Sequence, residues 1–206
     1  DEGDITCLGQ KLESVSIKEC LTKAADAINW NEKRKPGVGK GLACLWWVSG
    51  QWGTQTLIES NEDGSFRLIN GCVDMGTGGL SSSVIQMAAD GLEIRPELIQ
   101  LVRGDTDNLP WDHGHGGSRT VFTIGESAYE AAINLKQQIL KEGAEFFGLS
   151  LDQVYIFEER ICVRGDPSQF VSLSKICFDR HKKHGGPMVG VSSSLPQPHK
   201  DLGSCC

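Results

Sequence analysis

A glycine-rich loop followed by a helical apolar pattern is the part of this sequence best suited to chemistry. Residues 114–132 read G-H-G-G-S-R-T-V-F-T-I-G-E-S-A-Y-E-A-A. The two adjacent glycines carry no Cβ, so the backbone can approach a ligand closely or adopt a positive φ. The next three side chains supply two hydroxyls and a planar cation, a set suited to phosphate oxygens. The candidate binding residues of this loop are Gly116, Gly117, Ser118, Arg119 and Thr120.

If a helix begins near Gly125, its first free N–H groups add a partial positive charge beside this loop. We therefore interpret the loop as an anion-binding site at a helix N-terminus. An ordinary glycine-rich connection has a similar composition and remains the alternative.

A second glycine-rich turn, at residues 71–79, also joins a predicted strand to a predicted helix. It reads G-C-V-D-M-G-T-G-G, and its candidate binding residues are Gly76, Thr77 and Gly78. Ser81, Ser82 or Ser83 can cap the helix that follows. Because strand-to-helix turns often need glycine for their geometry alone, this turn by itself is weak support for binding.

The two turns are expected at the same edge of one sheet, because in each a strand gives way to a helix. Ligands commonly bind at such an edge in α/β arrangements. Two loops rich in donors can hold a ligand with several anionic or carbonyl oxygens. The residues thus predict a phosphorylated cofactor or substrate, without specifying a reaction.

Asp112, His113 and His115, in the long loop before Gly116, are conceivable metal ligands. Their close spacing in a glycine-rich loop, without a further ligand, gives poor support for such a site. No metal site is predicted.

The surrounding pattern predicts an α+β fold, in which a mixed sheet of antiparallel hairpins and strand–helix units packs with helices. Asp63-Gly64 is a hairpin signal between two strands. We expect a main body at residues 1–184, and a loop or disordered tail at residues 185–206, which we interpret as a truncation end. Helices are predicted within residues 12–30, 84–92, 127–148 (closing near 143 or 148) and 172–177, and strands at residues 42–49, 54–60, 66–70, 98–102, 154–157 and 160–163.

Composition narrows the partners and the environment. The 206 residues carry a net charge of -7, which argues against nucleic acid as the main partner. The longest apolar run, residues 42–49, is too short to span a membrane. Eight cysteines without a C-x-x-C pair or a zinc-finger histidine argue against zinc, and a disulfide framework is less favoured than free thiols. With no secretory signal at the N-terminus, we expect a cytoplasmic protein; Cys205-Cys206 is interpreted as an exposed end.

Several motifs in order give a more specific resemblance. V-D-M-G-T-G-G at 73–79 is followed by a helix, a strand ending in G-D-T, G-G-S-R-T at 116–120 and an alanine-rich helix. W-x5-P-G-x-G-x-G occupies residues 30–41. Over roughly residues 29–175 this order resembles the molybdenum-cofactor-binding subunit of the xanthine dehydrogenase/aldehyde oxidase family.

The resemblance implies that both turns contact molybdopterin and its phosphate, through the eight candidate residues named above. Many members of the family have glutamine at the position of Thr77, whose shorter hydroxyl can make fewer hydrogen bonds. The resemblance also places the family's general-base glutamate in a G-E motif beyond the end of this sequence. Gly125-Glu126 falls elsewhere in the pattern, so Glu126 is expected to support the helix N-terminus rather than catalysis.

The resemblance further implies a fragment, or one split subunit, of a molybdenum hydroxylase, forming one lobe of the cofactor-binding domain. The complete enzyme would hydroxylate a heterocycle or aldehyde with water-derived oxygen. Electrons would pass through 2Fe-2S clusters to FAD on other domains or subunits. The partners would be the remainder of the molybdenum subunit, the iron–sulfur and flavin subunits or domains, and a small-molecule substrate. The isolated chain is expected to be inactive and to bind little cofactor.

Two other functions remain open at this point. One is a stand-alone anion- or nucleotide-binding module that uses the two turns without redox chemistry. The other is an interaction protein whose glycine loops only make turns and whose apolar surface meets partner subunits.

Overall fold

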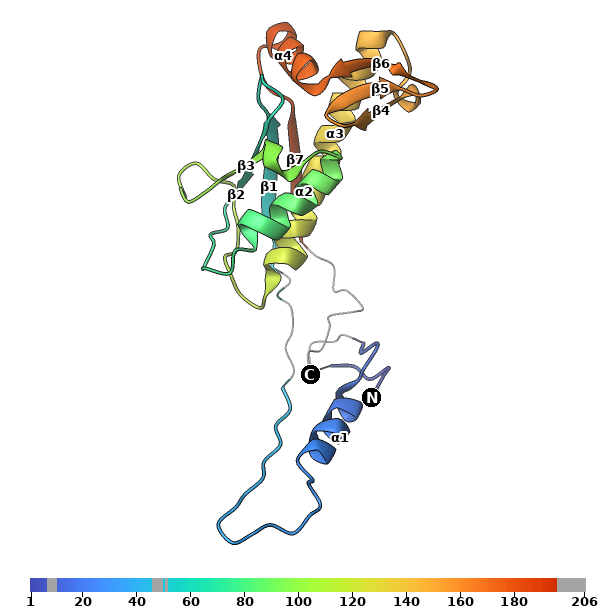
Figure 1. The fold of residues 1–206 in the computed structure, drawn as a ribbon. Coiled ribbons are helices and arrows are strands. Elements are labelled where there is room, and N and C mark those ends of the chain that lie inside the picture. Colours follow the sequence, from blue (N-terminus) through green and yellow to red (C-terminus); the bar gives the residue numbers. More distant parts are fainter. Residues whose placement is uncertain (7–10, 46–49, 51, 196–206) are drawn as a thin grey trace. The chain divides into compact units, whose positions relative to one another are not determined.

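The computed structural model describes residues 1–6, 11–45, 50 and 52–195 (Figure 1). They fall into two compact units, one built on residues 1–50 and one spanning residues 51–196. Each unit is described separately.

The first unit contains helix α1 (Ile17–Ala27). Ile17, Leu21 and Ala24 recur at the spacing that gives a helix one apolar side, which explains why the helix was predicted within residues 12–30. None of its residues is buried, and Ser16 at its N-cap makes no side-chain cap hydrogen bond. The strand predicted at 42–49 is not formed at residues 42–45, and its remaining residues lie outside the described part of the chain.

The second unit is organised around a four-stranded mixed sheet with the order β3-β2-β1-β7. The hairpin around Asp63-Gly64 pairs β1 with β2 in antiparallel register, as predicted. The strands β2 and β3 are parallel and are joined through the π-helical turn η1 and helix α2. The elements are β1 (Thr54–Ser60), β2 (Phe66–Asn70), η1 (Leu80–Val84), α2 (Ile85–Leu92), β3 (Ile99–Val102) and β7 (Val189–Ser194).

Strand β7 corrects the prediction of a loop or tail from residue 185 onwards. It pairs with β1 in antiparallel register, with Val191 opposite Leu57. Long-range pairing, which composition does not reveal, supplies the hydrogen bonds that this Ser- and Gly-rich segment cannot gain locally. Side chains of the neighbouring helix add to it: Asn134 Nδ2 donates to Val191 O at 2.9 Å, and Gln138 Nε2 donates to Val189 O at 2.7 Å.

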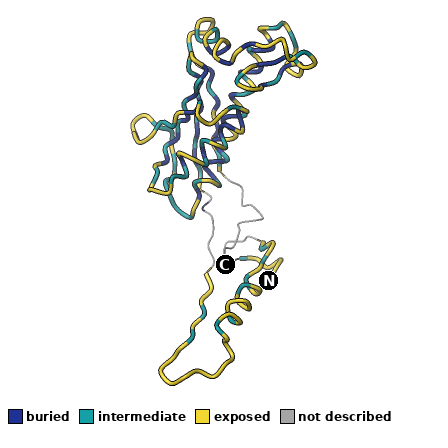
Figure 2. The backbone as a smooth tube through the Cα atoms, viewed as in Figure 1, coloured by how far each residue is buried: buried dark blue, intermediate teal, exposed yellow. Residues whose placement is uncertain are grey.

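Helices α2 and α3 (Glu126–Phe147) pack on the sheet, and the buried residues gather between these layers (Figure 2). The helix α3 ends at Gly148, which has a left-handed φ of 68°, in agreement with one of the two predicted endings. Apolar side chains of the sheet pack closely against the alanines of α3, because alanine side chains are small. The fully buried members of this core include Ile58, Phe66, Leu68, Leu92, Ala128, Ala131, Ala132 and Leu135.

A smaller antiparallel sheet, with the order β4-β5-β6, follows α3. The predicted hairpin is confirmed, whereas β6 was not predicted, and α4 continues well past the predicted end at residue 177. Ser172 caps α4, since its hydroxyl accepts a hydrogen bond from Lys175 N at 3.2 Å. The elements are β4 (Val154–Phe157), β5 (Arg160–Val163), β6 (Asp166–Ser172) and α4 (Leu173–His184); the short 3-10 turns η2 (Pro96–Leu98) and η4 (Leu151–Gln153) precede β3 and β4.

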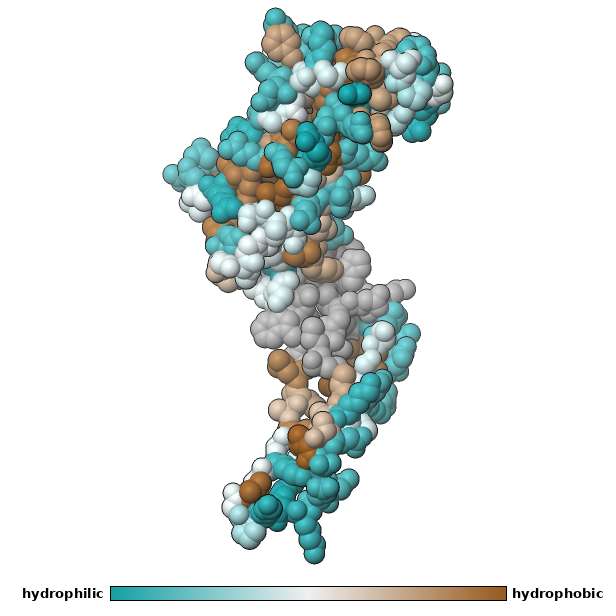
Figure 3. Space-filling view, viewed as in Figure 1, coloured by the Kyte–Doolittle hydropathy of each residue, from teal (hydrophilic) through white to brown (hydrophobic). Residues whose placement is uncertain are grey.

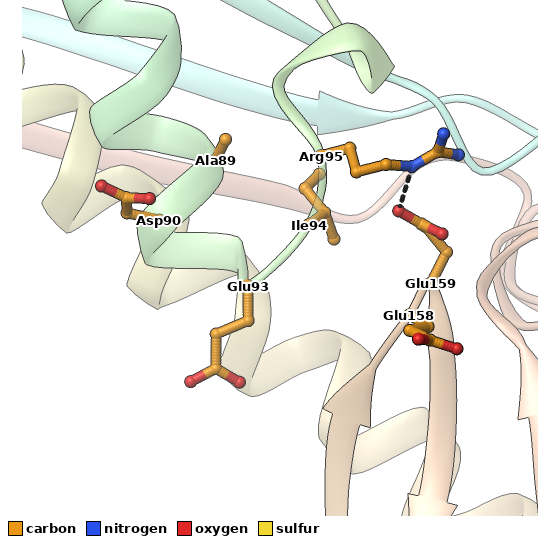
Figure 4. Close-up of a pocket in the computed structure, with 7 residues that line it drawn as sticks. All are labelled: Ala89, Asp90, Glu93, Ile94, Arg95, Glu158 and Glu159. Carbon is orange, nitrogen blue, oxygen red and sulfur yellow. Dashed lines mark hydrogen bonds and ion pairs between the residues drawn. The ribbon is translucent and has the colours of Figure 1, made fainter.

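A groove of ≈ 420 Å³ lies between the end of α2 and the β4–β5 turn (Figure 4). Arg95 Nε donates to Glu159 Oε1 at 2.7 Å across it. Three glutamates that line it, Glu93, Glu158 and Glu159, have positive φ angles of 58°, 46° and 54°. The β4–β5 turn therefore carries two strained non-glycine residues in succession.

The mixed and antiparallel sheets with their packed helices confirm the predicted α+β fold. On the face shown in Figure 3, polar side chains cover most of the second unit and apolar side chains emerge between them. Among the described residues, no helix combines the length and the apolar character needed to cross a membrane.

Candidate functional site

The two glycine turns meet in the second unit, as predicted. One connects β2 to η1, and the other leads into the π-helical turn η3 (Thr120–Gly125), which continues directly into α3. The turns η1 and η3 pack against each other. A Cβ placed at Gly79 would lie 3.2 Å from Thr120 Cγ2, so the turns are in van der Waals contact. The helical segment begins at Thr120 rather than near Gly125, which brings its first amides closer to the loop than expected.

His115 joins the two turns. Its Nε2 contacts the carbonyl oxygen of Val73 and lies 3.2 Å from Cys72 Sγ. Its Nδ1 lies 3.0 Å from Thr120 Oγ1. From the sequence, His115 was a conceivable metal ligand only. Its bridging position was not predictable, because nothing local in the sequence links residue 115 to residue 73.

Arg119 holds the second turn from inside. Its Nη1 donates to both Asp112 carboxylate oxygens at 3.1 Å and to Gly114 O at 2.8 Å. Its Nη2 donates to the carbonyl oxygens of Trp52 and Gly53 at 2.9 and 3.0 Å. The ion pair is closed to solvent, with side chains 0% and 1% exposed.

This burial corrects the expectation that the Arg119 guanidinium is offered to an anion. A guanidinium donates in a fixed planar fork, and here both Nη groups are occupied by protein oxygens. Its buried Nε has no hydrogen-bond partner among the described residues. Arg119 therefore fixes the shape of the loop rather than facing a ligand.

In the first turn, the backbone closes around Asp74. The amides of Gly76 and Gly78 donate to Asp74 Oδ1 at 2.9 and 3.0 Å, which holds the pKa of that carboxyl below its usual range. Both glycines have a positive φ, of 101° and 74°, as this wrapping requires. Thr77, at the tip, is exposed, and its hydroxyl has no partner in the described part of the chain.

In the second turn, hydrogen-bond donors of Gly117 and Ser118 are not used within the described part of the protein. Gly117 and Ser118 both have a φ of 55°, and Ser118 is exposed. No hydrogen bond occupies the N–H groups of these two residues, or the Ser118 hydroxyl, among the residues that the structure describes. Positive φ at a serine is uncommon and is often found where backbone strain serves a function.

Three aromatic side chains pack together beside this turn. Trp52 stacks on His113, with ring centroids 4.8 Å apart and planes 22° apart, and Trp111 meets the same imidazole edge-on. A Cβ at Gly116 would fall 2.5 Å from Trp52 Cζ3, so any larger residue there would require the indole to shift. Trp52 and Trp111 are themselves partly exposed, as is Met75 on the first turn, which gives the site an apolar rim.

The conceivable metal ligands point to different partners. Asp112 pairs with Arg119, His113 stacks on Trp52, and His115 binds Val73 and Thr120. In the described ranges, no three His, Cys, Asp or Glu side chains are arranged to hold a metal ion.

Two sets of residues predicted to stabilise helix N-termini are placed differently from the prediction. The Ser81 and Ser82 hydroxyls donate to Gly78 O, at 3.2 and 2.7 Å, instead of accepting from amides as caps. Glu126 lies inside a continuous helical segment because η3 precedes it. Its buried Oε2 has no hydrogen-bond partner within the described residues.

Comparisons with known proteins agree on one family. The sequence profile described as "Molybdopterin cofactor-binding domain" matches residues 12–197. The chain is 30% identical over 191 residues to the "Probable hypoxanthine oxidase XdhD" of Escherichia coli (strain K12), covering 88% of this chain and 20% of that protein. It is 26% identical over 212 residues to the "Putative xanthine dehydrogenase molybdenum-binding subunit XdhA" of the same organism, covering 93% of this chain and 28% of that protein.

The fold is also similar to solved structures. CO dehydrogenase from Oligotropha carboxidovorans superposes with a TM-score of 0.72 at 20% identity, over 93% of this chain and 28% of that one. The aldehyde oxidoreductase of Desulfovibrio desulfuricans gives a TM-score of 0.59 at 22% identity, over 99% of this chain and 21% of that one. The chain thus spans between a fifth and 28% of the length of these proteins.

Proposed function

The chain belongs to the family of molybdopterin cofactor-binding domains, and we propose that its two glycine turns hold the pyranopterin and the phosphate of the molybdenum cofactor. The relatives are molybdenum hydroxylase-type oxidoreductases of which this chain matches a part. The proposed contact residues are Gly76, Thr77, Gly78, Gly116, Gly117, Ser118 and Thr120, with Arg119 supporting the second turn from inside.

The donor set of the second turn fits a phosphate. The N–H groups of Gly117 and Ser118 and the Ser118 hydroxyl are available, and these are the groups that bind oxyanions at helix N-termini. The first turn offers the Thr77 hydroxyl. Its two glycine amides are held by Asp74, so this turn would contact the cofactor by close backbone approach.

The observation that carries the proposal is the contact between the turns, in which Gly79 meets Thr120 and His115 binds to both. Groups from two separate segments can therefore act on one ligand. The apolar rim of Trp52, Trp111 and Met75 suits a planar ring better than a bare anion.

The proposal extends to the complete enzyme. When bound there, the cofactor would supply the molybdenum centre for hydroxylation of a heterocycle or aldehyde with water-derived oxygen. The partners would be the remainder of the molybdenum subunit and the domains or subunits that carry 2Fe-2S clusters and FAD. The complete enzyme would lie in the cytoplasm. This chain would contribute one wall of the cofactor cleft.

The cofactor contact can be tested on the chain by nuclear magnetic resonance. The 15N-labelled chain is titrated with inorganic sulfate, with a pterin phosphate and with adenosine monophosphate. We expect the amide signals of Gly117 and Ser118 to move with all three ligands, and the pterin phosphate to bind most tightly. Ser118→Ala is expected to weaken binding, whereas Ser168→Ala, on the distant strand β6, should leave it unchanged.

Equal affinity for the nucleotide and the pterin would favour a general anion- or nucleotide-binding module. Binding by the isolated chain is expected to be weak, because it supplies only one wall of the cleft. Amide signals that stay in place at both turns with all three ligands would contradict the proposed contact.

A further inference from the structure

The contacts of His115 determine which of its nitrogens carries the proton. Val73 O can only accept a hydrogen bond, so the Nε2 that faces it must carry hydrogen. Cys72 Sγ, at 3.2 Å from the same nitrogen, does not change this, because an unprotonated Nε2 would direct its lone pair at the carbonyl oxygen. In the neutral imidazole, Nδ1 is then the acceptor.

The hydroxyl of Thr120 must consequently donate to Nδ1, 3.0 Å away. A hydroxyl has one hydrogen, so in this state Thr120 presents only lone pairs to a ligand. Those lone pairs repel an oxyanion. When Nδ1 gains a proton, the direction of the hydrogen bond reverses, and the Thr120 hydrogen becomes free to point at the anion.

We propose that His115 is a positioning residue which couples binding of the cofactor's phosphate at the glycine turns to uptake of one proton, through reversal of the Thr120–His115 hydrogen bond. The inference rests on the proposed function and adds a means of regulation to the same site. Anion affinity should increase as the pH falls, by up to about tenfold per pH unit across the titration of this histidine.

The groups around His115 can accommodate its positive charge. Within its own loop, the Asp112–Arg119 ion pair is already neutral as a unit. From the other turn, Cys72 is a thiol whose pKa burial raises to about 12, so it remains uncharged; it also contacts the Asp112 carboxylate of that ion pair. The Asp74 carboxylate of the same turn is held by glycine amides. From η3, the group that faces the imidazole is the uncharged Thr120.

The test follows the imidazole nitrogens of the 15N-labelled chain by nuclear magnetic resonance over the pH range in which histidine titrates, with and without sulfate. Sulfate is chosen because it does not change its own charge in that range. We expect His115 to be the Nε2–H tautomer without sulfate. We also expect sulfate to raise its titration midpoint and to bind more weakly as the pH rises.

Thr120→Val removes the hydroxyl and preserves the shape, while Thr120→Ser preserves the hydroxyl. The sulfate-induced increase in the midpoint should be lost in Thr120→Val and retained in Thr120→Ser. His113, in the same loop but stacked on Trp52, is an internal control for simple charge attraction and should move much less.

An Nδ1–H tautomer in the free chain would overturn the coupling. An equal shift in wild type and Thr120→Val, or in His115 and His113, would also overturn it, since charge attraction alone would then suffice. If sulfate moves the Gly117 and Ser118 amides but not the His115 midpoint, only the coupling fails. If sulfate moves neither, both the coupling and the phosphate-binding role of the turns are wrong.

Discussion

The guanidinium of Arg119 and the carboxylate of Asp112 form an ion pair that solvent does not reach, with both carboxylate oxygens 3.1 Å from the same nitrogen. A buried charge that loses its partner retains the full cost of its desolvation. The same guanidinium also binds three backbone carbonyl oxygens of the surrounding loops. The pair is therefore the main polar support of the second glycine turn.

Arg119→Met is expected to lower the free energy of unfolding by about 3–5 kcal/mol, because Asp112 and the carbonyl oxygens lose their donor. Urea denaturation measures the change. Arg95→Ala, which breaks the exposed pair with Glu159, serves as the control and should leave the denaturation midpoint nearly unchanged. Similar midpoints for the two variants would contradict the supporting role of Arg119.

Ser118→Gly should separate stability from binding. Glycine removes the left-handed strain of roughly 1–2 kcal/mol at this position, and its greater freedom in the unfolded chain offsets part of that gain. The variant should therefore be as stable as wild type or slightly more so, yet bind sulfate more weakly because the hydroxyl is lost. Thermal denaturation and the amide titration measure the two effects. Ser118→Ala, which keeps the strain, should lose affinity without gaining stability.

The β4–β5 turn offers a second strained pair. Glu158 and Glu159 occupy a two-residue hairpin loop with positive φ at both positions, a geometry that favours Asn-Gly. The double substitution Glu158→Asn and Glu159→Gly should stabilise the chain by about 1 kcal/mol, measured by urea denaturation. Glu159→Gln, which alters the contact with Arg95 shown in Figure 4 but keeps the backbone, should not stabilise it.

The buried thiol of Cys177 should make stability fall in alkaline solution. Burial raises its pKa from 9.0 to about 12. Above about pH 9 the unfolded chain loses this proton and the folded chain keeps it, so the free energy of unfolding decreases as the pH rises towards 12. The expected slope is about 1.4 kcal/mol per pH unit for each such thiol.

Unfolding curves between neutral pH and pH 11 measure this slope, to which Cys72 contributes a second thiol. Cys177→Ala should reduce it by one thiol, whatever its effect on stability at neutral pH. Replacing Cys44, which is exposed, should leave the slope unchanged, and a slope that persists in Cys177→Ala would contradict the prediction.

Local patterns were sufficient for much of the fold. The strands at residues 54–60 and 66–70 were predicted with their observed bounds because alternating burial and the Asp63-Gly64 turn are encoded within a few residues. β7 was missed because its pairing with β1 depends on residues far along the chain. The π-helical start at Thr120 was missed because apolar spacing marks the α-helix but not the irregular turn before it.

The location of the candidate site could be predicted from the sequence, but the contacts of its side chains could not. The strand-to-helix positions of the two turns allowed their meeting to be predicted. The direction of each side chain was not predictable, since Arg119 turns inward only because Asp112 and three carbonyl oxygens surround it. The bridging role of His115 likewise depends on Val73 being brought beside it by the packing of η1 on η3.

The position of β7 beside β1 has a consequence for biosynthesis. On the ribosome, β1 and β2 emerge early, whereas the strand that completes the sheet emerges only after α4. Until then, one side of β1 presents unpaired N–H and C=O groups, to which strands of other nascent molecules can add. Removing β7 from the mature protein would leave the same edge of β1 unpaired.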